Sequence, residues 1–168
     1  MSSNVASVID SERRLELNYP SWNVRRIVSL FEPVSDEHPQ GNGRIYLPGH
    51  QREWSWNHAS GLKKQQKFID SVLHNFPIPM VILNQEDDGV RERWQIYDGR
   101  HRVETLWRFV NNKFSIRGGI YYRDLNDADR TRFNERIIPV AITVCASNEQ
   151  LADIFTRLNS GKALTQAD

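Results

Sequence analysis

A tight turn between a strand pattern and an amphipathic helix is the feature that most limits how this chain can fold. Residues 94–97 (Trp-Gln-Ile-Tyr) are typical of a strand, and they run directly into Asp98 and Gly99. Beyond the turn, apolar residues recur at i, i+3, i+4 and i+7, the spacing of a helix with one buried face. These residues are Val103, Leu106, Trp107 and Val110. The sequence therefore predicts a strand, a tight turn and a helix in immediate succession.

The start of this helix has the composition of an anion-binding site. The first turn of a helix presents backbone N–H groups that lack helical partners and a partial positive charge, and both favour phosphate. Gly99 allows the backbone to approach a ligand closely, while Arg100 and Arg102 offer guanidinium donors that match phosphate oxygens. We expect His101 to assist proton transfer and Asp98 to hold a metal ion or orient water.

A purely structural interpretation of the same residues stays open. Asp98 is also a suitable N-cap for the helix. The cationic side chains that follow would then form surface ion pairs, each worth about 0–1 kcal/mol.

Strand and helix patterns are mixed along the rest of the chain. Strands are predicted near residues 45–47, 80–83, 94–97, 113–116 and 137–145. Helices are predicted over 24–31, from Ser60 to Phe76, after Gly99 and from Asn126 to Phe133. A last helix is predicted after a capping box formed by Ser147 and Gln150. Its apolar residues, which we expect to form a buried stripe, are Leu151, Ile154, Phe155 and Leu158. This order indicates an α+β fold. We expect residues 1–21 to be a flexible lead-in and residues 22–168 to form one domain.

The net charge and the cysteine content limit the kind of ligand site and the cellular compartment that we expect. The net charge is only +1, so a field over the whole molecule does not drive binding to nucleic acid, and any anion site must be local. The single cysteine, Cys145, lies in an apolar run and is expected to be a small buried side chain in a reducing compartment. No apolar run approaches the roughly 20 residues of a membrane helix, so we expect an intracellular protein of the cytoplasm or nucleus.

Four segments of the chain carry motifs in a fixed order. Residues 48–56 are similar to P-x-x-Q-R-x-x-x-W, and the segment 69–73 leads to Pro-Ile-Pro at 77–79. Residues 97–109 are similar to D-G-Q-Q-R-x-x-T-L-x-x-F, and residues 155–164 to F-x-R-L-N-x-G-x-x-L. In this order the segments resemble the ParB/sulfiredoxin-like superfamily, in the branch that forms the N-terminal domain of GmrSD-type, modification-dependent restriction enzymes. The resemblance implies a compact ParB-like domain with a small mixed sheet flanked by helices.

The resemblance also implies a nucleotide pocket. The positions that carry the family's own residue types are Gln51, Arg52, Asp98, Gly99, Arg102, Thr105 and Asn159. Family members use the motif for nucleoside-triphosphate binding or hydrolysis in the restriction of modified or phage DNA. A nucleoside triphosphate as ligand, Mg²⁺ as cofactor, DNA as partner and a nuclease located in a separate subunit or domain are therefore expected.

The chain departs from the family pattern within the turn. Arg100 and His101 stand where the branch has two glutamines, so a role that needs an amide, such as orienting an attacking water, does not transfer. The added positive charge favours binding over turnover. The turn is also similar to the Gly-Cys-His-Arg loop of sulfiredoxin, but Arg100 occupies the place of the nucleophilic cysteine, which excludes sulfiredoxin chemistry at this position.

The leading function is therefore a nucleoside-triphosphate-binding domain, and slow hydrolysis of the nucleotide stays open as a further activity. In this interpretation Asp98 positions Mg²⁺ or water and His101 transfers a proton, while the phosphates are held by Arg52, Arg100 and Arg102. Two alternatives stay open: a DNA-binding or regulatory module with a degenerate nucleotide site, and a metal-dependent DNA nuclease. Trp54 and Trp56 are candidates for stacking on a base, against the alternative that they are packing residues.

Overall fold

A five-stranded mixed sheet with the strand order β1-β5-β3-β4-β2 organises the chain. The computed structural model describes residues 14–38, 41–47, 59–87 and 92–160. Within these ranges the strands are β1 (Leu17–Asn18), β2 (Ile45–Tyr46), β3 (Val81–Asp87), β4 (Glu92–Asp98) and β5 (Val140–Val144). The helices are α1 (Val24–Leu30), α2 (Ala59–Leu73), α3 (Arg100–Val110), the 3₁₀ turn η2 (Tyr122–Asp124), α4 (Asp127–Glu135) and α5 (Asn148–Ser160). The expected α+β class is confirmed.

The centre of the sheet is formed by β3, which pairs with β4 in antiparallel and with β5 in parallel orientation. The strands predicted near residues 80–83 and 94–97 are thus neighbours in the sheet. β5 is buried over most of its length and consists largely of β-branched residues, which suit a pleated and buried surface. In β4 the buried residues are Trp94 and Ile96. β2 adds to the other side of β4 in parallel, and β1 closes the opposite edge. β1 lies inside the segment expected to be a lead-in.

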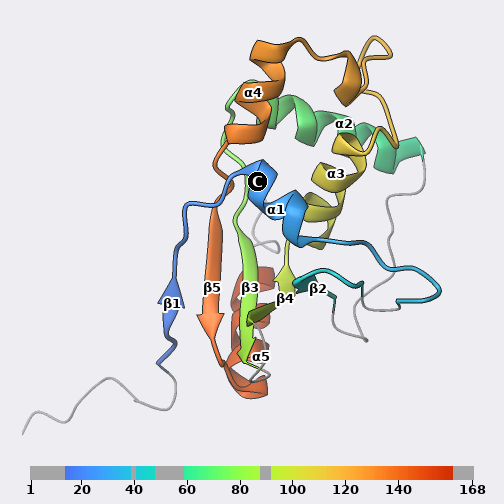
Figure 1. Ribbon diagram of the computed structural model, residues 1–168. Helices are drawn as coiled ribbons and strands as arrows, with labels where there is room; N and C mark the ends of the chain where they lie inside the picture. The colour runs from blue at the N-terminus through green and yellow to red at the C-terminus, as the bar shows by residue number, and fades with distance from the viewer. Residues whose placement is uncertain (1–13, 39–40, 48–58, 88–91, 161–168) are drawn as a thin grey trace, which may run out of the picture.

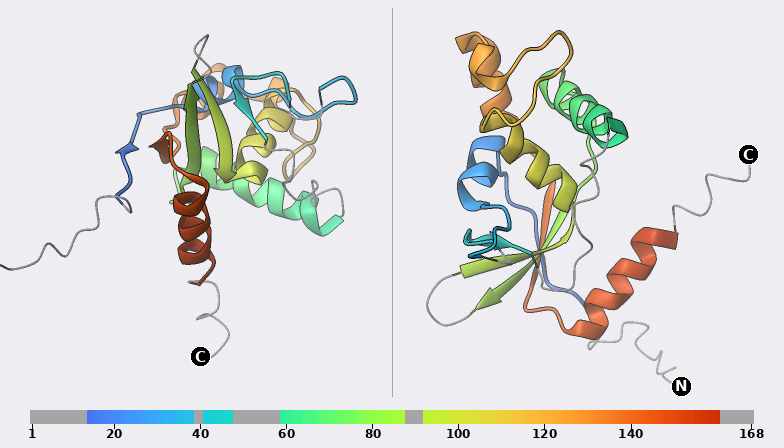
Figure 2. Two further views of the ribbon diagram at one scale, coloured as in Figure 1. Left: turned by 90° about the horizontal axis from the view of Figure 1, so that it is seen from below. Right: turned by 90° about the vertical axis from the view of Figure 1, so that its right-hand side faces the viewer.

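The helices lie on both sides of this sheet. Figures 1 and 2 show α1 on one side, α2 and α5 toward the other, and α3 running away from the end of β4. The predicted apolar stripe of α3 is confirmed, because Val103 and Leu106 are buried together with Phe109. Asn126 caps α4 as expected by accepting a hydrogen bond from the backbone N–H of Asp129 at 2.8 Å.

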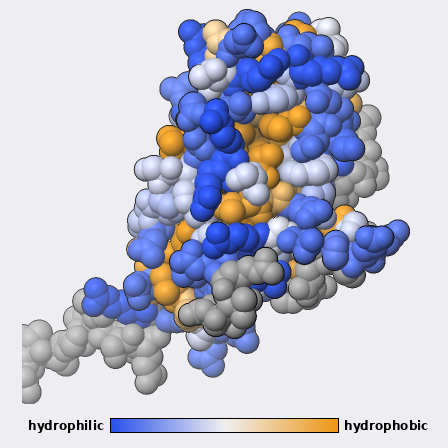
Figure 3. All heavy atoms as spheres, in the orientation of Figure 1, coloured by the Kyte–Doolittle hydropathy of each residue, from blue (hydrophilic) through white to orange (hydrophobic). Residues whose placement is uncertain are grey.

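The surface over the α1 side is mostly hydrophilic, with hydrophobic residues visible between polar ones near its centre (Figure 3). Trp94 is buried, with the guanidinium of Arg44 4.7 Å from its ring centroid and Trp22 packed edge-on. Within the described residues, no helix has both the length and the apolar character to cross a membrane.

Two predicted apolar faces are only partly covered. In α2, Ile69 and Val72 are buried, whereas Leu62 is exposed and Phe76 lies exposed beyond the end of the helix.

The capping box at the start of α5 is confirmed, since the Ser147 and Gln150 side chains exchange hydrogen bonds with each other's backbone N–H groups. The expectation of a buried apolar stripe on α5 is wrong, because Phe155 and Leu158 of this stripe are exposed. They are exposed because α5 extends away from the rest of the molecule (Figure 2).

Two further expectations are corrected by the structure. Residues 113–116 do not form a strand: they turn, and Ile116 makes only an isolated bridge with Ile120. Cys145 is exposed rather than buried, because β5 ends at Val144 and the next residue adopts a positive φ of 48° that turns the chain out of the sheet.

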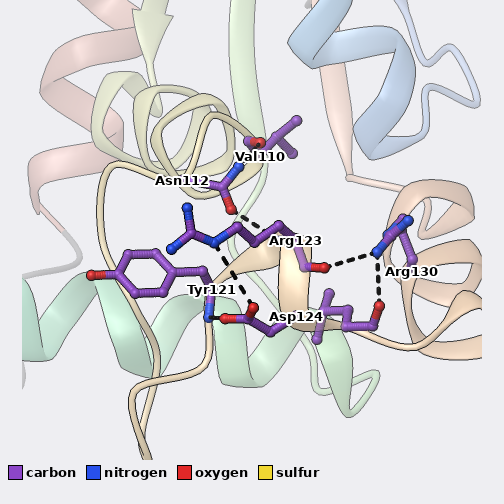
Figure 4. A network of polar contacts seen from close by, with 7 residues as sticks. Val110, Asn112, Tyr121, Arg123, Asp124 and Arg130 are labelled. Carbon is purple, nitrogen blue, oxygen red and sulfur yellow. Dashed lines mark hydrogen bonds and ion pairs between the residues drawn. The ribbon is translucent and has the colours of Figure 1, made fainter.

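The arginines that follow the turn region hold loops together. The Arg130 guanidinium donates to the carbonyl oxygens of Arg123 at 3.1 Å and Leu125 at 2.8 Å, which fastens η2 to α4 (Figure 4). In the same way Arg136 donates to the carbonyl oxygen of Phe76 at 2.9 Å. Arg130 and Arg136 therefore satisfy backbone acceptors and help to hold the fold together.

Candidate functional site

The junction between β4 and α3 is built on a glycine. Gly99 is the N-cap of α3 with φ +97°, a left-handed conformation that other residues adopt at a cost. A Cβ at this position would lie 3.0 Å from the Cγ2 of Val81 and 3.1 Å from Nη2 of Arg102. Glycine is therefore required here both for the turn and for the close approach of β3.

The first turn of α3 has no side-chain cap and no acidic residue. The structural alternative in which Asp98 caps the helix is thus wrong, because Gly99 occupies the cap position. The backbone N–H groups of the first turn and the helix dipole keep the general properties of an anion site. The strand, tight turn and helix predicted from the sequence are confirmed as the local architecture.

Asp98 instead pairs with Arg102 across one turn. Nη2 of Arg102 lies 2.7 Å from the Oδ2 of Asp98 and also donates to the carbonyl oxygen of Met80 at 2.8 Å. The Arg102 side chain is largely buried, whereas that of Asp98 is half-exposed. This arrangement ties the end of β4, the start of β3 and the first turn of α3 together, so Arg102 has a structural duty in addition to any ligand contact.

Arg100 has an internal partner as well. Its Nε lies 3.6 Å from the Oε2 of Glu104, one turn further along α3, and both side chains are largely buried. Burial raises the pKa of Glu104, while the positive charges of Arg100 and Arg108 act in the opposite direction. Sequence reasoning missed Glu104; the Arg-Glu-Arg spacing of i, i+4 and i+8 was the available signal.

His101 is half-buried among positive charges. Burial lowers its pKa below the ordinary histidine value, and the neighbouring charges of Arg100 and Arg102 lower it further. Lys64 of α2 acts in the same direction, which places a cation of that helix near the start of α3, whereas Asp98 opposes the shift. The imidazole is therefore neutral at pH 7 and can accept a proton. Lys64 is a second residue that sequence reasoning missed.

Thr105 is fully buried, at 0% exposed, and its Oγ1 has no hydrogen-bond partner in the described part of the chain. A buried hydroxyl in this state is unusual, because most buried polar groups are satisfied. The side chain lies on α3 one turn beyond His101. Its hydroxyl is therefore both shielded from solvent and unpaired within the described ranges.

Asp98 is the residue that was expected to hold a metal ion at this junction. The described residues contain no group of three or more histidine, cysteine, aspartate or glutamate side chains that could hold a metal ion. A single half-exposed carboxylate nevertheless suits Mg²⁺, which keeps several waters and is commonly held by one or two carboxylates together with substrate phosphates.

The side chains of the remaining predicted site residues are not described. Gln51, Arg52, Trp54 and Trp56 all lie in the segment 48–58, of which the structure gives no description. Asn159 belongs to the last turn of α5, but its side chain is not described either. The structure thus brings together Asp98, Gly99, Arg100, His101, Arg102 and Thr105 on one turn and the helix that follows it.

Comparison with known proteins gives one match. The family model described as the N-terminal domain of GmrSD restriction endonuclease matches residues 29–168. Comparisons with curated proteins and with solved structures gave no match. The matched range includes the whole β4–α3 junction and α5.

Proposed function

Because the chain belongs to the family of GmrSD restriction endonuclease N-terminal domains, we propose that it binds a nucleoside triphosphate at the β4–α3 junction and acts with DNA in restriction-type defence. Slow hydrolysis of the bound nucleotide is part of this proposal. The observation that carries it is the glycine N-cap of α3, which leaves the first turn without a side-chain cap among cationic residues. A phosphate group suits such a helix start in charge and in hydrogen-bonding capacity.

The side chains at the junction have distinct proposed roles. Arg100 binds phosphate oxygens, and Arg102 shapes the turn through its bonds to Asp98 and to the carbonyl oxygen of Met80. Asp98 is the ligand for Mg²⁺, which supplies charge neutralisation at the phosphates when bound. The neutral imidazole of His101 accepts the proton of an attacking water.

A thermal-shift panel tests the binding proposal. Nucleoside di- and triphosphates are added with and without Mg²⁺, and the melting temperature is recorded for wild type, D98N and D70N. A ligand at 100 times its Kd stabilises the native state by about 2.7 kcal/mol. For a chain of this size that corresponds to a rise of about 5–10 °C in Tm.

The two variants separate the site from the rest of the surface. D98N should lose the Mg²⁺-dependent part of the rise. D70N removes an exposed carboxylate of α2 that pairs with His74, so it should respond like wild type. A flat response of wild type to every nucleotide would contradict the proposal.

A second candidate is a DNA-binding or regulatory module without turnover. The observation that favours it is the presence of Arg100 and His101 where the family motif has two amides. DNA would then bind with an affinity that falls steeply with salt, since phosphate contacts release counterions. R100Q should reduce the slope of log K against log [salt] by about 1. A metal-dependent nuclease, the third possibility, would nick plasmid DNA in the presence of Mg²⁺.

A further inference from the structure

A charged stripe runs along α3 from its first residue, and the middle member of this stripe is buried. Its members are Arg100, Glu104 and Arg108, spaced so that they lie on one face of the helix one turn apart. Glu104 is buried, the side chain of Arg100 is 14% exposed, and Arg108 is partly buried. α3 packs against both α1 and α2.

A carboxylate at this depth is stable only with charged or hydrogen-bonding partners. Glu104 has them on both sides, because the positive charges of Arg100 and Arg108 counteract the rise in its pKa that burial causes. The same contact restrains Arg100: an arginine side chain has several rotatable bonds, and an acid one turn away on the same helix fixes where its guanidinium lies. A preorganised guanidinium loses less entropy when it binds an anion.

The geometry points to Glu104 as a positioning residue, which holds the guanidinium of Arg100 in place to receive a phosphate group at the start of α3. This inference rests on the proposed function. It also accounts for a departure of the chain from its family motif. A glutamine at position 100 needs no counter-charge, whereas a largely buried arginine does, and Glu104 supplies it from the same helix.

The test is a double-mutant cycle on binding of inorganic triphosphate, measured by isothermal titration calorimetry. The variants are E104Q, R100Q and E104Q/R100Q, with E135Q as the matched control. Glu135 pairs with Arg25 at 2.9 Å on an exposed surface of α4, so E135Q removes a Glu–Arg pair that is not part of the α3 stripe. E104Q should weaken triphosphate binding by about 5–10-fold in the wild-type background and by less than about twofold in the R100Q background.

The outcomes separate this inference from the proposed function. If wild type binds triphosphate and E104Q binds it as tightly or more tightly, Glu104 does not position Arg100 and the inference alone is wrong. Equal weakening in both backgrounds would show that Glu104 acts through the fold, and would also overturn it. If wild type fails to bind triphosphate, both proposals fall.

A conservative variant covers the case in which E104Q does not fold. E104D keeps the negative charge but withdraws it by one methylene. The melting temperature of E104D should be closer to that of wild type than the melting temperature of E104Q is. E104D should weaken triphosphate binding in the wild-type background and have no effect on it in the R100Q background. An E104D variant whose affinity equals that of wild type would contradict a role that depends on position.

Discussion

Replacing Thr105 by valine should make the ligand-free protein more stable. The side chain is fully buried, at 0% exposed, and its Oγ1 has no hydrogen-bond partner in the described ranges. A buried hydroxyl without a partner costs about 1–3 kcal/mol. Valine has the same shape without that cost, and its helix propensity is close to that of threonine. We expect T105V to gain about 1–3 kcal/mol in the free energy of unfolding, with Tm rising by about 2–4 °C for each kcal/mol.

Thr143 provides the matched control. It is also a threonine at 0% exposed, but its Oγ1 donates to the Oδ1 of Asn84 at 2.7 Å. T143V removes a satisfied hydroxyl and takes away one of the hydrogen bonds of Asn84. The expected change is a loss of about 1–3 kcal/mol. The same substitution at equal burial should therefore shift stability in opposite directions at the two positions.

Urea unfolding with circular dichroism as the readout measures both variants, and the linear extrapolation gives the free energies. On the proposed function, the hydroxyl of Thr105 is unpaired because it serves the ligand. T105V should then bind triphosphate about tenfold less tightly, which corresponds to one hydrogen bond of about 1.4 kcal/mol. A T105V variant less stable than wild type would refute the reasoning, because it would show that the hydroxyl contributes to the fold.

Three further predictions concern the junction and α5. G99A should destabilise the protein by about 1–2 kcal/mol in urea unfolding, since a left-handed φ of +97° disfavours any Cβ; equal stability would contradict the account. The pKa of His101 is lowered in the fold, so the unfolded chain takes up the proton first and stability should decrease as pH falls below about 6.5. Unfolding curves from pH 7.5 to 5 should show a smaller decrease for H101Q. S147A should cost about 0.5–2 kcal/mol by breaking the capping box of α5, with a fluorescence melt as the check.

The parts of the fold that local signals specify could be predicted from the sequence. The strand, turn and helix around Gly99 follow from an apolar period, a turn dipeptide and a helix start that all agree. β1 could not be found in this way, because a strand of two residues has no measurable period. Its pairing with β5 joins residues more than 120 positions apart, such as Leu17 and Thr143.

The spacing of apolar residues does not predict whether the apolar face of a helix is covered by another element. The stripe of α5 has helical spacing, and the helix is present, but spacing alone does not say whether a surface such as that of Leu158 meets another element. Residues 113–116 failed for a related reason. Phe114 is buried against the core from within a turn, so an apolar side chain there indicates packing rather than a strand.

The local structure around the candidate site could be predicted from the sequence, but the pairing of its charged side chains could not. The expectation that Asp98 caps the helix is wrong, because Gly99 is the N-cap and Asp98 pairs with Arg102. Charged side chains one turn apart on a helix often pair, and this rule applied to α3 finds the contact between Arg100 and Glu104. It does not find the contact between Asp98 and Arg102, because Asp98 is the last residue of β4 and lies before the helix.

Oxyanion binding at the β4–α3 junction is tested most directly by an NMR titration. Backbone amide signals of ¹⁵N-labelled protein are followed as a nucleoside triphosphate is added with Mg²⁺. We expect the largest shifts, which should saturate, at Gly99, Arg100 and His101, and the same pattern in D70N. Saturable shifts confined to another part of the molecule, or none at millimolar nucleotide, would contradict it.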